Sequence, residues 1–452
     1  GAMQQDLGRH LKIGEIIWQT RSVPQTNLFT YTNPDFRFVN HHWLSEVFFY
    51  LTGGVFGLKG IFVLKLFLVT AALLLAFYAA FRLTDFLPAV VSFLVFLPLV
   101  TYRADERPEL FGFLLFSLLF LILFVLPYEK RRVLVGAPFI IFLWVNLHLT
   151  FIFGLLFAGV WALYNFWKKD LNFREILIFS FSVALSAVLN PNGFRGVFYP
   201  FTIFLNYGYR IVENQSVFFL MSRIDNRMIL YFFGAVFLSV CGMLYAVLRR
   251  RRISVLYFLA IVFAILSFKA DRNFPFFGLV GIPVFAFILA EIRGSVFLKR
   301  ILEKFGFLRN EEGVLLLGAA VFIVFLIVTV FKAPRFFGIP EYGKKGVDFF
   351  VSEQLPGNIF NNFDIGGYLD YRLYPEYKVF IDNRPEAYPK EFFDEYIKIQ
   401  QDPEFRKEAF ERYDIRTVIF SHTDITPWAQ EFLGQMIRDG EWTLVFRDSF
   451  LV

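Results

Sequence analysis

The chain has 452 residues, of which 57% are hydrophobic, 19% are charged and 65 are phenylalanine. A soluble domain is typically about 45–50% apolar and about 25% charged, so most of this chain is expected in lipid. The apolar content excludes a disordered chain, and the single cysteine, Cys241, excludes an internal disulfide framework. The net charge of +6 is unevenly divided, because residues 340–452 carry −8 and the preceding residues carry +14. The positive charge lies in short clusters between apolar runs, which is typical of membrane proteins and not of a nucleic-acid groove.

Residues 1–58 are predicted to form a first outer loop with amphipathic helices in the membrane plane. Apolar residues at positions 7, 11, 13, 16 and 17 have the spacing of a helix on the membrane surface. Val23-Pro24 should end this helix, since the residue before a proline disfavours helical geometry. Leu44–Phe56 is a second apolar stretch that is too short to span comfortably, so an in-plane helix is expected before Gly57.

Residues 59–332 are predicted to form a multi-span transmembrane domain, because one crossing needs about 20 mostly apolar residues in a helix. The clear candidate spans are Ile61–Ala80, Leu110–Leu126, Met228–Leu248, Ile253–Phe268, Phe274–Ala290 and Val314–Phe331, with Leu87–Val100 and Ile176–Leu189 as shorter candidates. The uncharged run Val133–Trp167 would be about 52 Å long as a single helix, which is too long for one crossing. We therefore expect two helices that meet at Asn146-Leu147-His148, and about ten spans in this chain.

The basic clusters predict the orientation, because short cytoplasmic loops are rich in lysine and arginine. Residues 130–132, 168–169, 249–252 and 293–309 would face the cytoplasm, and the N-terminal and C-terminal regions would face the other side. The first segment would then lie outside with no span before it. Since Gly1-Ala2-Met3 is typical of a cloning remnant, we expect a native first helix upstream and eleven spans in the native protein.

Residues 333–452 are predicted to form a small α/β domain on the outer face. Helices are expected at Val347–Gln354, Glu391–Gln401 and Pro403–Tyr413, and strands at Asn358–Phe360, Lys378–Ile381 and Thr417–Phe420. Gly366–Leu369 is expected to follow a turn, and Trp442–Phe446 is expected to form a hairpin with Ser449–Val452. The predicted fold class is thus an α-helical polytopic membrane protein with a small α/β outer domain.

Ionisable residues concentrate in the predicted outer loops, which suggests a polar cavity on that face. A substrate linked through phosphate needs cations for the leaving phosphate and a carboxylate that takes the proton of the incoming hydroxyl. The candidates in these loops include Asp6 among the carboxylates and, for substrate or phosphate binding by charge and location, His10, Lys12, His41, His42, Arg103, Arg107, His148 and Arg272. Any one of these charges could instead be solvated or bind lipid headgroups, and His148 could instead satisfy backbone groups at a helix break. Lys65 lies about one turn inside its span and is expected to snorkel to the interface.

No metal or cofactor is favoured by the sequence. Adjacent side chains diverge on a helix or a strand, so His41 and His42 are not expected to bind one ion together. Cysteine and histidine lack the spacing of a zinc site. There is also no phosphate-cradling glycine loop, nucleophile elbow or Rossmann fingerprint, which argues against an ATP-driven transporter and against soluble nucleotide-sugar chemistry.

Several motifs follow one another along nearly the whole chain. The first is Asp6-Leu7-Gly8-Arg9-His10-Leu11-Lys12-Ile13-Gly14-Glu15, followed by Val23-Pro24, Phe29-Thr30-Tyr31-Thr32 and His41-His42-Trp43-Leu44-Ser45-Glu46. The others are Arg107-Pro108, Trp144-Val145-Asn146-Leu147-His148, Asn190-Pro191-Asn192-Gly193, the segment Phe360–Leu369 and Phe380-Ile381-Asp382-Asn383-Arg384. In this order they resemble the motifs of bacterial GT-C-fold integral membrane glycosyltransferases.

The resemblance implies transfer of a sugar from a polyprenyl-phosphate carrier, with an aspartate of the first outer loop deprotonating or positioning the acceptor. Only Asp6 fits that place. Many relatives have a second acidic residue where this chain has Gln4, and His-Glu-Trp where it has His41-His42-Trp43. These departures weaken the case for a mechanism that uses a divalent metal and favour a metal-independent inverting transfer. They also leave open that the protein is a non-catalytic member of this group.

The predicted function is therefore a glycosyltransferase of a bacterial inner or plasma membrane, with its active site and C-terminal domain on the extracytoplasmic side. The predicted partners are a polyprenyl-phosphate-linked sugar donor, membrane lipid and an unknown acceptor that is a lipid, a glycan or a protein, and no nucleic acid. Two alternatives remain open. One is a flippase or other transporter of lipid-linked glycans, which would need polar or broken spans near the bilayer midplane. The other is a non-catalytic scaffold or assembly subunit with the GT-C fold.

Overall fold

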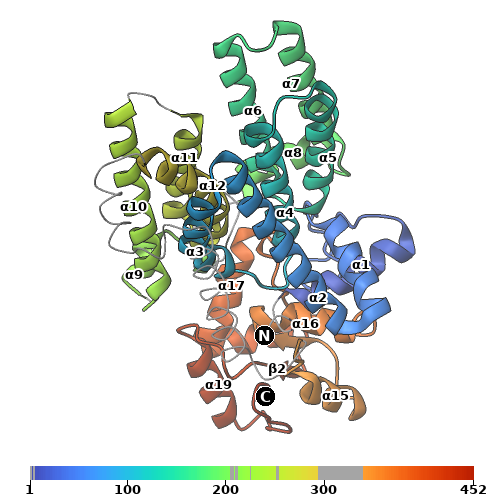
Figure 1. The fold of residues 1–452 in the computed structure, drawn as a ribbon. Coiled ribbons are helices and arrows are strands. Elements are labelled where there is room, and N and C mark those ends of the chain that lie inside the picture. The colour runs from blue at the N-terminus through green and yellow to red at the C-terminus, as the bar shows by residue number, and fades with distance from the viewer. Residues whose placement is uncertain are drawn as a thin grey trace.

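The computed structural model describes Met3 and residues 6–203, 208, 212–223, 225–250, 254–293 and 339–452. Within these residues the protein is mostly helical, and the C-terminal segments gather at one end of the helical part together with the N-terminus (Figure 1). The predicted span Val314–Phe331 lies outside the described residues.

The helical part contains α1 (Leu7–Thr20), α2 (Trp43–Leu83), α3 (Phe86–Thr101), α4 (Glu109–Phe120), α5 (Ala137–Leu147), α6 (Phe151–Lys168), α7 (Phe173–Val188), α8 (Gly193–Thr202), α9 (Val217–Met221), α10 (Arg227–Arg250), α11 (Val255–Lys269) and α12 (Phe274–Arg293). The C-terminal part contains α15 (Lys344–Ser352), β1 (Ile359–Asn361), α16 (Phe363–Leu373), α17 (Lys390–Gln401), α18 (Pro403–Arg412), β2 (Thr417–Ile419) and α19 (Ala429–Arg438).

The helical part has the properties of a membrane domain. Four described helices are long and apolar enough to cross a bilayer, and α7 with α8 is a fifth candidate that bends by 89° between its halves. Helices α3, α4, α5 and α11 are shorter but equally apolar. Each span predicted within the described residues coincides with a helix. The predicted break in the run Val133–Trp167 is confirmed, since α5 ends at Leu147 and α6 begins at Phe151.

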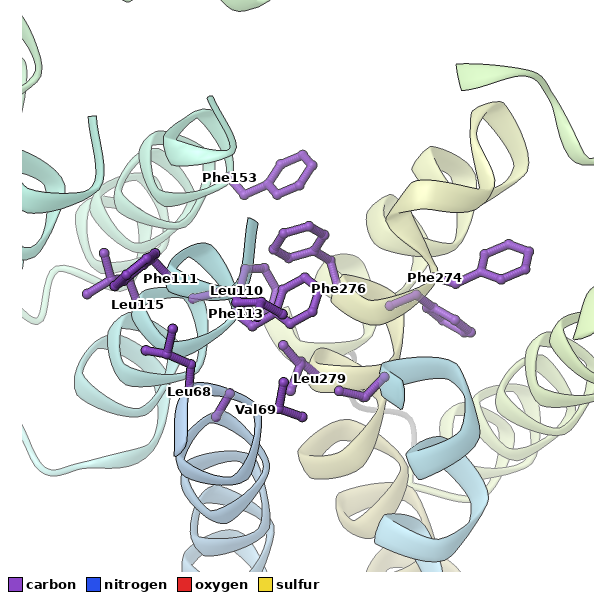
Figure 2. Packing of buried hydrophobic residues seen from close by; sticks show 14 of the residues in the cluster. Leu68, Val69, Leu110, Phe111, Phe113, Leu115, Phe153, Phe274, Phe276 and Leu279 are labelled. Carbon is purple, nitrogen blue, oxygen red and sulfur yellow. The ribbon is translucent and has the colours of Figure 1, made fainter. Parts of the chain in front are cut away.

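Helix α12 lies at the centre of this domain and contacts α2, α3, α4, α10 and α11. Figure 2 shows its side chains packed against aliphatic residues of α2 and against aromatic residues of α4 and α6. The ring of Phe276 lies 5.2 Å from that of Phe113 and 4.8 Å from that of Phe153. Edge-on pairs of this kind each add about 0.5–1.5 kcal/mol beyond the area they bury, so this core holds the helix ends in fixed relative positions.

Helix α1 is the predicted amphipathic helix, but it does not lie with its apolar face on lipid. Leu7, Leu11 and Ile17 are buried, and α1 packs between α2 and α16. The packing is close, because a Cβ at Gly14 would lie 2.1 Å from the Glu46 carbonyl oxygen and one at Gly8 would lie 2.8 Å from that of Gly367. A C-terminal helix thus covers the face that periodicity alone would assign to lipid, and the placement of α1 relative to the membrane stays a prediction.

The second apolar stretch of the first loop also forms a helix. This helix and the first span follow each other directly and together form α2. The helical backbone is interrupted between them at Gly57, where φ is 63° and ψ is −169°. Only glycine adopts this conformation without strain. The predicted division before and after Gly57 is confirmed by this break.

The C-terminal domain is built around a two-stranded parallel sheet, in which Ile359 of β1 pairs with Thr417 of β2. The helices α15, α17 and α18 and both strands match the prediction, whereas Lys378–Ile381 contributes only isolated bridges at Val379. Two expectations are wrong. Gly366–Leu369 lies inside α16, and Trp442–Phe446 forms no hairpin, because the last residues pair instead with the end of β2 through Ser421 and Leu451.

The first outer loop is joined to this C-terminal domain. The Val379 amide donates to the Phe29 carbonyl at 3.0 Å, and the Tyr31 amide donates to the Val379 carbonyl at 3.3 Å. The buried Arg384 guanidinium binds both carboxylate oxygens of Asp382 and the side-chain oxygen of Asn27. An apolar pattern within either segment could not reveal this contact, which places the loop after Asp382 beside the start of α1.

Candidate functional site

One cavity of about 90 Å³ lies where the start of α1, the segment before α2 and the break between α5 and α6 approach the loops of α4 and α12. Segments far apart in the chain meet there because the aromatic core fixes the helix ends and α16 holds α1. The lining residues are Asp6, Arg9, His10, His41, His42, Arg107, Pro108, Glu109, His148, Leu149, Ile203, Glu213, Arg272, Asn383, Pro385 and Glu386.

Most of the residues singled out in the sequence lie in this cavity. The ones that line it are Asp6, His10, His41, His42, Arg107, His148 and Arg272. Arg103 lies beside it and forms ion pairs with Glu213 and, at 4.0 Å, with Asp271. Lys12 does not line it, because its Nζ pairs with Glu15 at 2.9 Å. The structure thus establishes proximity for these side chains and leaves their chemical roles as predictions.

Asp6 stands at the N-cap of α1, yet its carboxylate makes no capping hydrogen bond to the helix. It faces the cavity instead, where Oδ2 lies 3.1 Å from Nε of Arg107 and Oδ1 accepts a hydrogen bond of 2.7 Å from Asn383. Arg9 lies 3.7 Å from the same carboxylate. The side chain is 25% exposed. Asp6 is therefore an accessible carboxylate held in one orientation by donors from three different segments.

Arg107 connects Asp6 to a second carboxylate, that of Glu213, whose Oε2 lies 2.7 Å from its Nη1. Arg103 binds the same Glu213 oxygen. Burial disfavours the charge of Glu213, but Arg107, Arg272 and Arg103 outweigh this and hold its pKa well below the usual value. The same two carboxylates raise the pKa of Arg107 despite its burial. Glu213 was missed in the sequence, where it is only one acidic residue in a long outer loop without a motif.

The four cavity histidines are uncharged at neutral pH. Burial lowers the pKa of His10, His42 and His148 well below the usual value, with nearby arginine or histidine acting in the same direction. Burial also lowers the pKa of His41 to about 4. Each ring therefore offers one N–H donor and one nitrogen lone pair, and hydrogen bonds decide which nitrogen carries the proton.

The tautomer of His148 follows from its neighbours. Its Nδ1 receives the backbone N–H of Thr150 at 3.2 Å and lies 2.8 Å from the Thr150 hydroxyl. That hydroxyl oxygen in turn accepts the Trp144 indole N–H at 3.1 Å, so its own hydrogen is directed at His148. Nδ1 is consequently an acceptor and Nε2 carries the proton. A neutral N–H donor on the cavity wall suits a phosphate or hydroxyl oxygen.

His41 and His42 lie together, contrary to the expectation that their rings diverge. Their centroids are 3.9 Å apart, and His42 also contacts the rings of His10 at 5.4 Å and His148 at 5.0 Å. The expectation was wrong because the two residues lie in neither a helix nor a strand: α2 begins at Trp43, and His42 is its N-cap with φ −115° and ψ 4°.

The C-terminal domain contributes part of the wall. Asn383 binds Asp6 through its amide, and its side-chain oxygen accepts a hydrogen bond of 3.1 Å from Arg9. Pro385 and Glu386 follow in the same loop. The motif around Asn383 was recognised in the sequence, but nothing in that motif indicates which distant residue it contacts.

Comparison with solved structures places this arrangement in a known fold. The Archaeoglobus fulgidus oligosaccharyltransferase tethered with an acceptor peptide that contains the NVT sequon matches 92% of this chain, with a TM-score of 0.53 and 13% identity. A second structure of that protein, in complex with Zn and sulfate, matches 92% of this chain with a TM-score of 0.53 and 12% identity.

The chain has the GT-C fold.

The alignments cover 65% and 64% of the archaeal protein, so this GT-C chain spans less than two thirds of its length. No protein-family model matches the chain, and no curated protein matches it. At 12–13% identity the likeness concerns the fold, together with the membrane character that the apolar helices support independently.

Proposed function

We propose that this protein is a membrane glycosyltransferase that transfers a sugar from a polyprenyl-phosphate carrier to an acceptor at the extracytoplasmic face. The observation that carries the proposal is the cavity itself, in which an accessible carboxylate, Asp6, lies among guanidinium and neutral imidazole groups. The GT-C fold and the apolar helices support a membrane-embedded glycosyltransferase. The basic loops of the sequence support the proposed orientation.

In the proposed reaction Asp6 is the general base. It takes the proton of the acceptor nucleophile while that atom forms a bond to the anomeric carbon of the sugar. The bond from that carbon to the phosphate oxygen breaks, and its electron pair leaves with the polyprenyl phosphate. Attack opposite the leaving group inverts the anomeric centre. General bases contribute about 10²–10⁴-fold to such rates.

The leaving phosphate would be received by the cationic side of the cavity. Arg107 and Arg272 line it, and the His148 N–H is directed by Thr150 as an uncharged donor. Fixed donors of this kind stabilise charge that develops in the transition state. Arg272 is held by the Asn214 side-chain oxygen, which accepts a hydrogen bond of 2.8 Å from it. The archaeal structure contains an acceptor peptide, whereas the acceptor here remains a lipid, a glycan or a protein.

The test compares Asp6→Asn with Asp35→Asn, a matched control at an exposed position of the same loop. Native membrane vesicles that contain the full-length protein together with the lipid, glycan and protein acceptors of the membrane are given polyprenyl-phosphate sugars labelled in the sugar. Loss of label from the carrier is followed, because that readout does not require the acceptor to be identified. We expect Asp6→Asn to lose about 100-fold or more of the rate while carrier affinity changes little, and Asp35→Asn to keep its activity.

A second variant separates catalysis from folding. Asp6→Asn places an amide among the donors of Asn383 and Arg107, so it also weakens packing. The swap of Asp6→Asn with Asn383→Asp restores an acceptor for these donors but moves the carboxylate. We expect the swap to recover thermal stability without recovering activity. Full activity in Asp6→Asn would exclude Asp6 as the base, and carrier binding without turnover of any donor would favour a non-catalytic subunit.

A further inference from the structure

A second group of side chains lies at the same end of the cavity and has no role in the proposed transfer. One ligand-type atom each from His10, His42 and Glu46 lies within 4.8 Å of the others. His10 and Glu46 are buried, with exposures of 2% and 0%. The atoms come from α1, from the residue before α2 and from the first turn of α2. Two imidazoles and one carboxylate are a common ligand set for zinc in proteins.

The contact between His10 and Glu46 has dimensions that suit a shared metal ion. His10 Nδ1 lies 2.9 Å from Glu46 Oε1, and the two atoms share one proton. Two ligands at about 2.0–2.1 Å from one tetrahedral zinc ion are separated by roughly 3.3 Å, so this pair would have to move apart by only about 0.4 Å to hold the ion. A metal ion can therefore replace this proton, which moves to Nε2 of the same ring, so His10 remains neutral. Glu46 Oε2 is meanwhile oriented by the Asn40 amide at 2.7 Å, a supporting contact typical of metal ligands.

The excess of carboxylates around the cavity also favours the binding of a cation. Among the described residues that line it or pair with a lining residue, carboxylates outnumber guanidiniums by five to four. The carboxylates are Asp6, Glu46, Glu109, Glu213 and Glu386, and the guanidiniums are Arg9, Arg103, Arg107 and Arg272. Glu109 is only 4% exposed, and its Oε1 has no hydrogen-bond partner. A buried carboxylate oxygen without a partner is costly, and a dication in the same cavity would lower that cost.

We propose that His10, His42 and Glu46 form a binding site for a divalent cation of the zinc type. His41 offers a further nitrogen on the same wall, since its Nδ1 donates to the Val39 carbonyl at 3.1 Å and Nε2 keeps its lone pair. His148 is not a ligand, because the Thr150 contacts place the proton on its Nε2 and occupy its Nδ1. The sequence favoured no metal site. From it we tested only whether His41 and His42 could bind one ion together, and we did not pair either residue with His10.

Arg9 is the competitor of this ion. Its Nη2 lies 3.4 Å from His10 Nε2 and its Nη1 lies 3.7 Å from Glu46 Oε1, so the guanidinium occupies the electrostatic position of a cation. Once the His10 proton moves to Nε2, this N–H and the Arg9 guanidinium would be two donors facing each other. The guanidinium would then turn toward Asn383 and Asp6. Its hydrogen bond to Asn383 at 3.1 Å is compatible with that position. Arg9→Gln is therefore expected to bind the ion more tightly.

The test measures metal binding directly and does not require the proposed transfer. Full-length protein in detergent is stripped with chelator, titrated with Zn²⁺ and assayed for bound metal, with Co²⁺ absorption as a report on ligand type. We expect about one ion per chain, and a loss of affinity of more than about 10-fold in His42→Ala and Glu46→Gln. His422→Ala and His148→Ala are controls that should retain binding, since His422 lies outside the cavity beside the Asp448 carbonyl.

The outcomes separate this inference from the proposed function. Asp6→Asn should still bind zinc even though it loses transfer. Absence of binding in the wild-type protein, or equal binding in His42→Ala, would overturn the metal site while leaving Asp6 as the base untouched. Loss of binding in His422→Ala but not in His42→Ala would assign the metal to another place and also overturn the inference. Because Glu46→Gln can disturb α1 packing, thermal stability of each variant is measured in parallel, and His42→Ala decides if Glu46→Gln does not fold.

Discussion

A partly buried ion pair between the first span and the loop of Arg107 allows a quantitative test of the structure. Lys65 Nζ lies 2.7 Å from Glu106 Oε1, and the two side chains are 20% and 9% exposed. The sequence suggested that Lys65 snorkels to the interface, but in the structure its charge is directed at a carboxylate one residue before Arg107. The pair therefore connects α2 to the loop that places Arg107 beside Asp6.

The stability lost on removing one partner of this ion pair can be worked out from its geometry. At an effective dielectric constant of about 20, unit charges about 2.7 Å apart attract by roughly 6 kcal/mol, and desolvation of both groups offsets much of this. Removing one partner leaves the other buried and uncompensated, which costs about 3–5 kcal/mol in buried pairs. We discount this to about 3 kcal/mol for Lys65→Met and for Glu106→Gln, because Lys65 is 20% exposed. The double variant should lose about 1 kcal/mol or less.

The assay is reversible unfolding in mixed micelles of the wild-type protein, both single variants and the double variant. A double-variant cycle isolates the coupling between the two side chains. We expect a coupling of about 5 kcal/mol, because the two single losses together exceed the loss in the double variant by that amount. Carrier affinity should also be lower in both single variants, because the Arg107 loop shifts. If each single variant changes stability by less than about 0.5 kcal/mol and the coupling is zero, the pair is solvated and the reasoning is wrong.

Three further predictions follow from other contacts. Glu213→Gln should raise the affinity for polyprenyl phosphate about tenfold, because the Glu213 carboxylate neutralises Arg103 and Arg107 in the wild-type protein. A binding titration measures this affinity, with Glu15→Gln as the control because its pair with Lys12 lies outside the cavity. Weaker binding in Glu213→Gln would show that Glu213 positions the arginines instead. Gly14→Ala should cost about 1–3 kcal/mol because its Cβ would meet the Glu46 carbonyl at 2.1 Å, whereas Gly54→Ala has open space, so equal unfolding midpoints would contradict the close packing of α1. Burial and the neighbouring Asp382 raise the pKa of Asp370 well above its usual value, so folded Asp370 keeps a proton that the unfolded chain releases near pH 4. Retention of this proton stabilises the wild-type protein at low pH, and the stabilisation is lost as pH rises through the pKa of folded Asp370. The free energy of unfolding of the wild type, relative to that of Asp370→Asn, should therefore increase as pH falls from 8 to 4.5. A difference that does not depend on pH would contradict this prediction.

The apolar runs were sufficient to predict the helices of the membrane part. Run length and the need to satisfy every backbone group in lipid leave few alternatives, so the span predictions coincide with helices wherever the structure describes them. The break between α5 and α6 was also predictable, because an uncharged run too long for one crossing contains a polar Asn146-Leu147-His148 segment. Local patterns worked less well in the C-terminal domain, where short strands depend on distant partners such as Thr417 for Ile359.

The candidate site was partly predictable for a different reason. Asp6, Arg107, His148 and Arg272 lie at helix ends on one predicted face, so orientation alone brings them to the same side of the membrane. Their convergence on a common cavity could not be read from the chain, because it depends on how α12 packs between its neighbours. Spacing also could not show that His10 and Glu46 touch, since 36 residues separate them.

The sequence by itself determined that this protein is a bundle of membrane helices with charged residues collected on one face, because hydropathy acts on each segment independently. The tertiary structure alone decided that α16 covers α1, that Asn383 holds Asp6, and that Glu213 and Glu46 stand among the cations. These contacts join segments from tens to hundreds of residues apart through close glycine packing and ion pairs. Their free energy depends on three-dimensional proximity, for which a linear pattern of residues contains no measure.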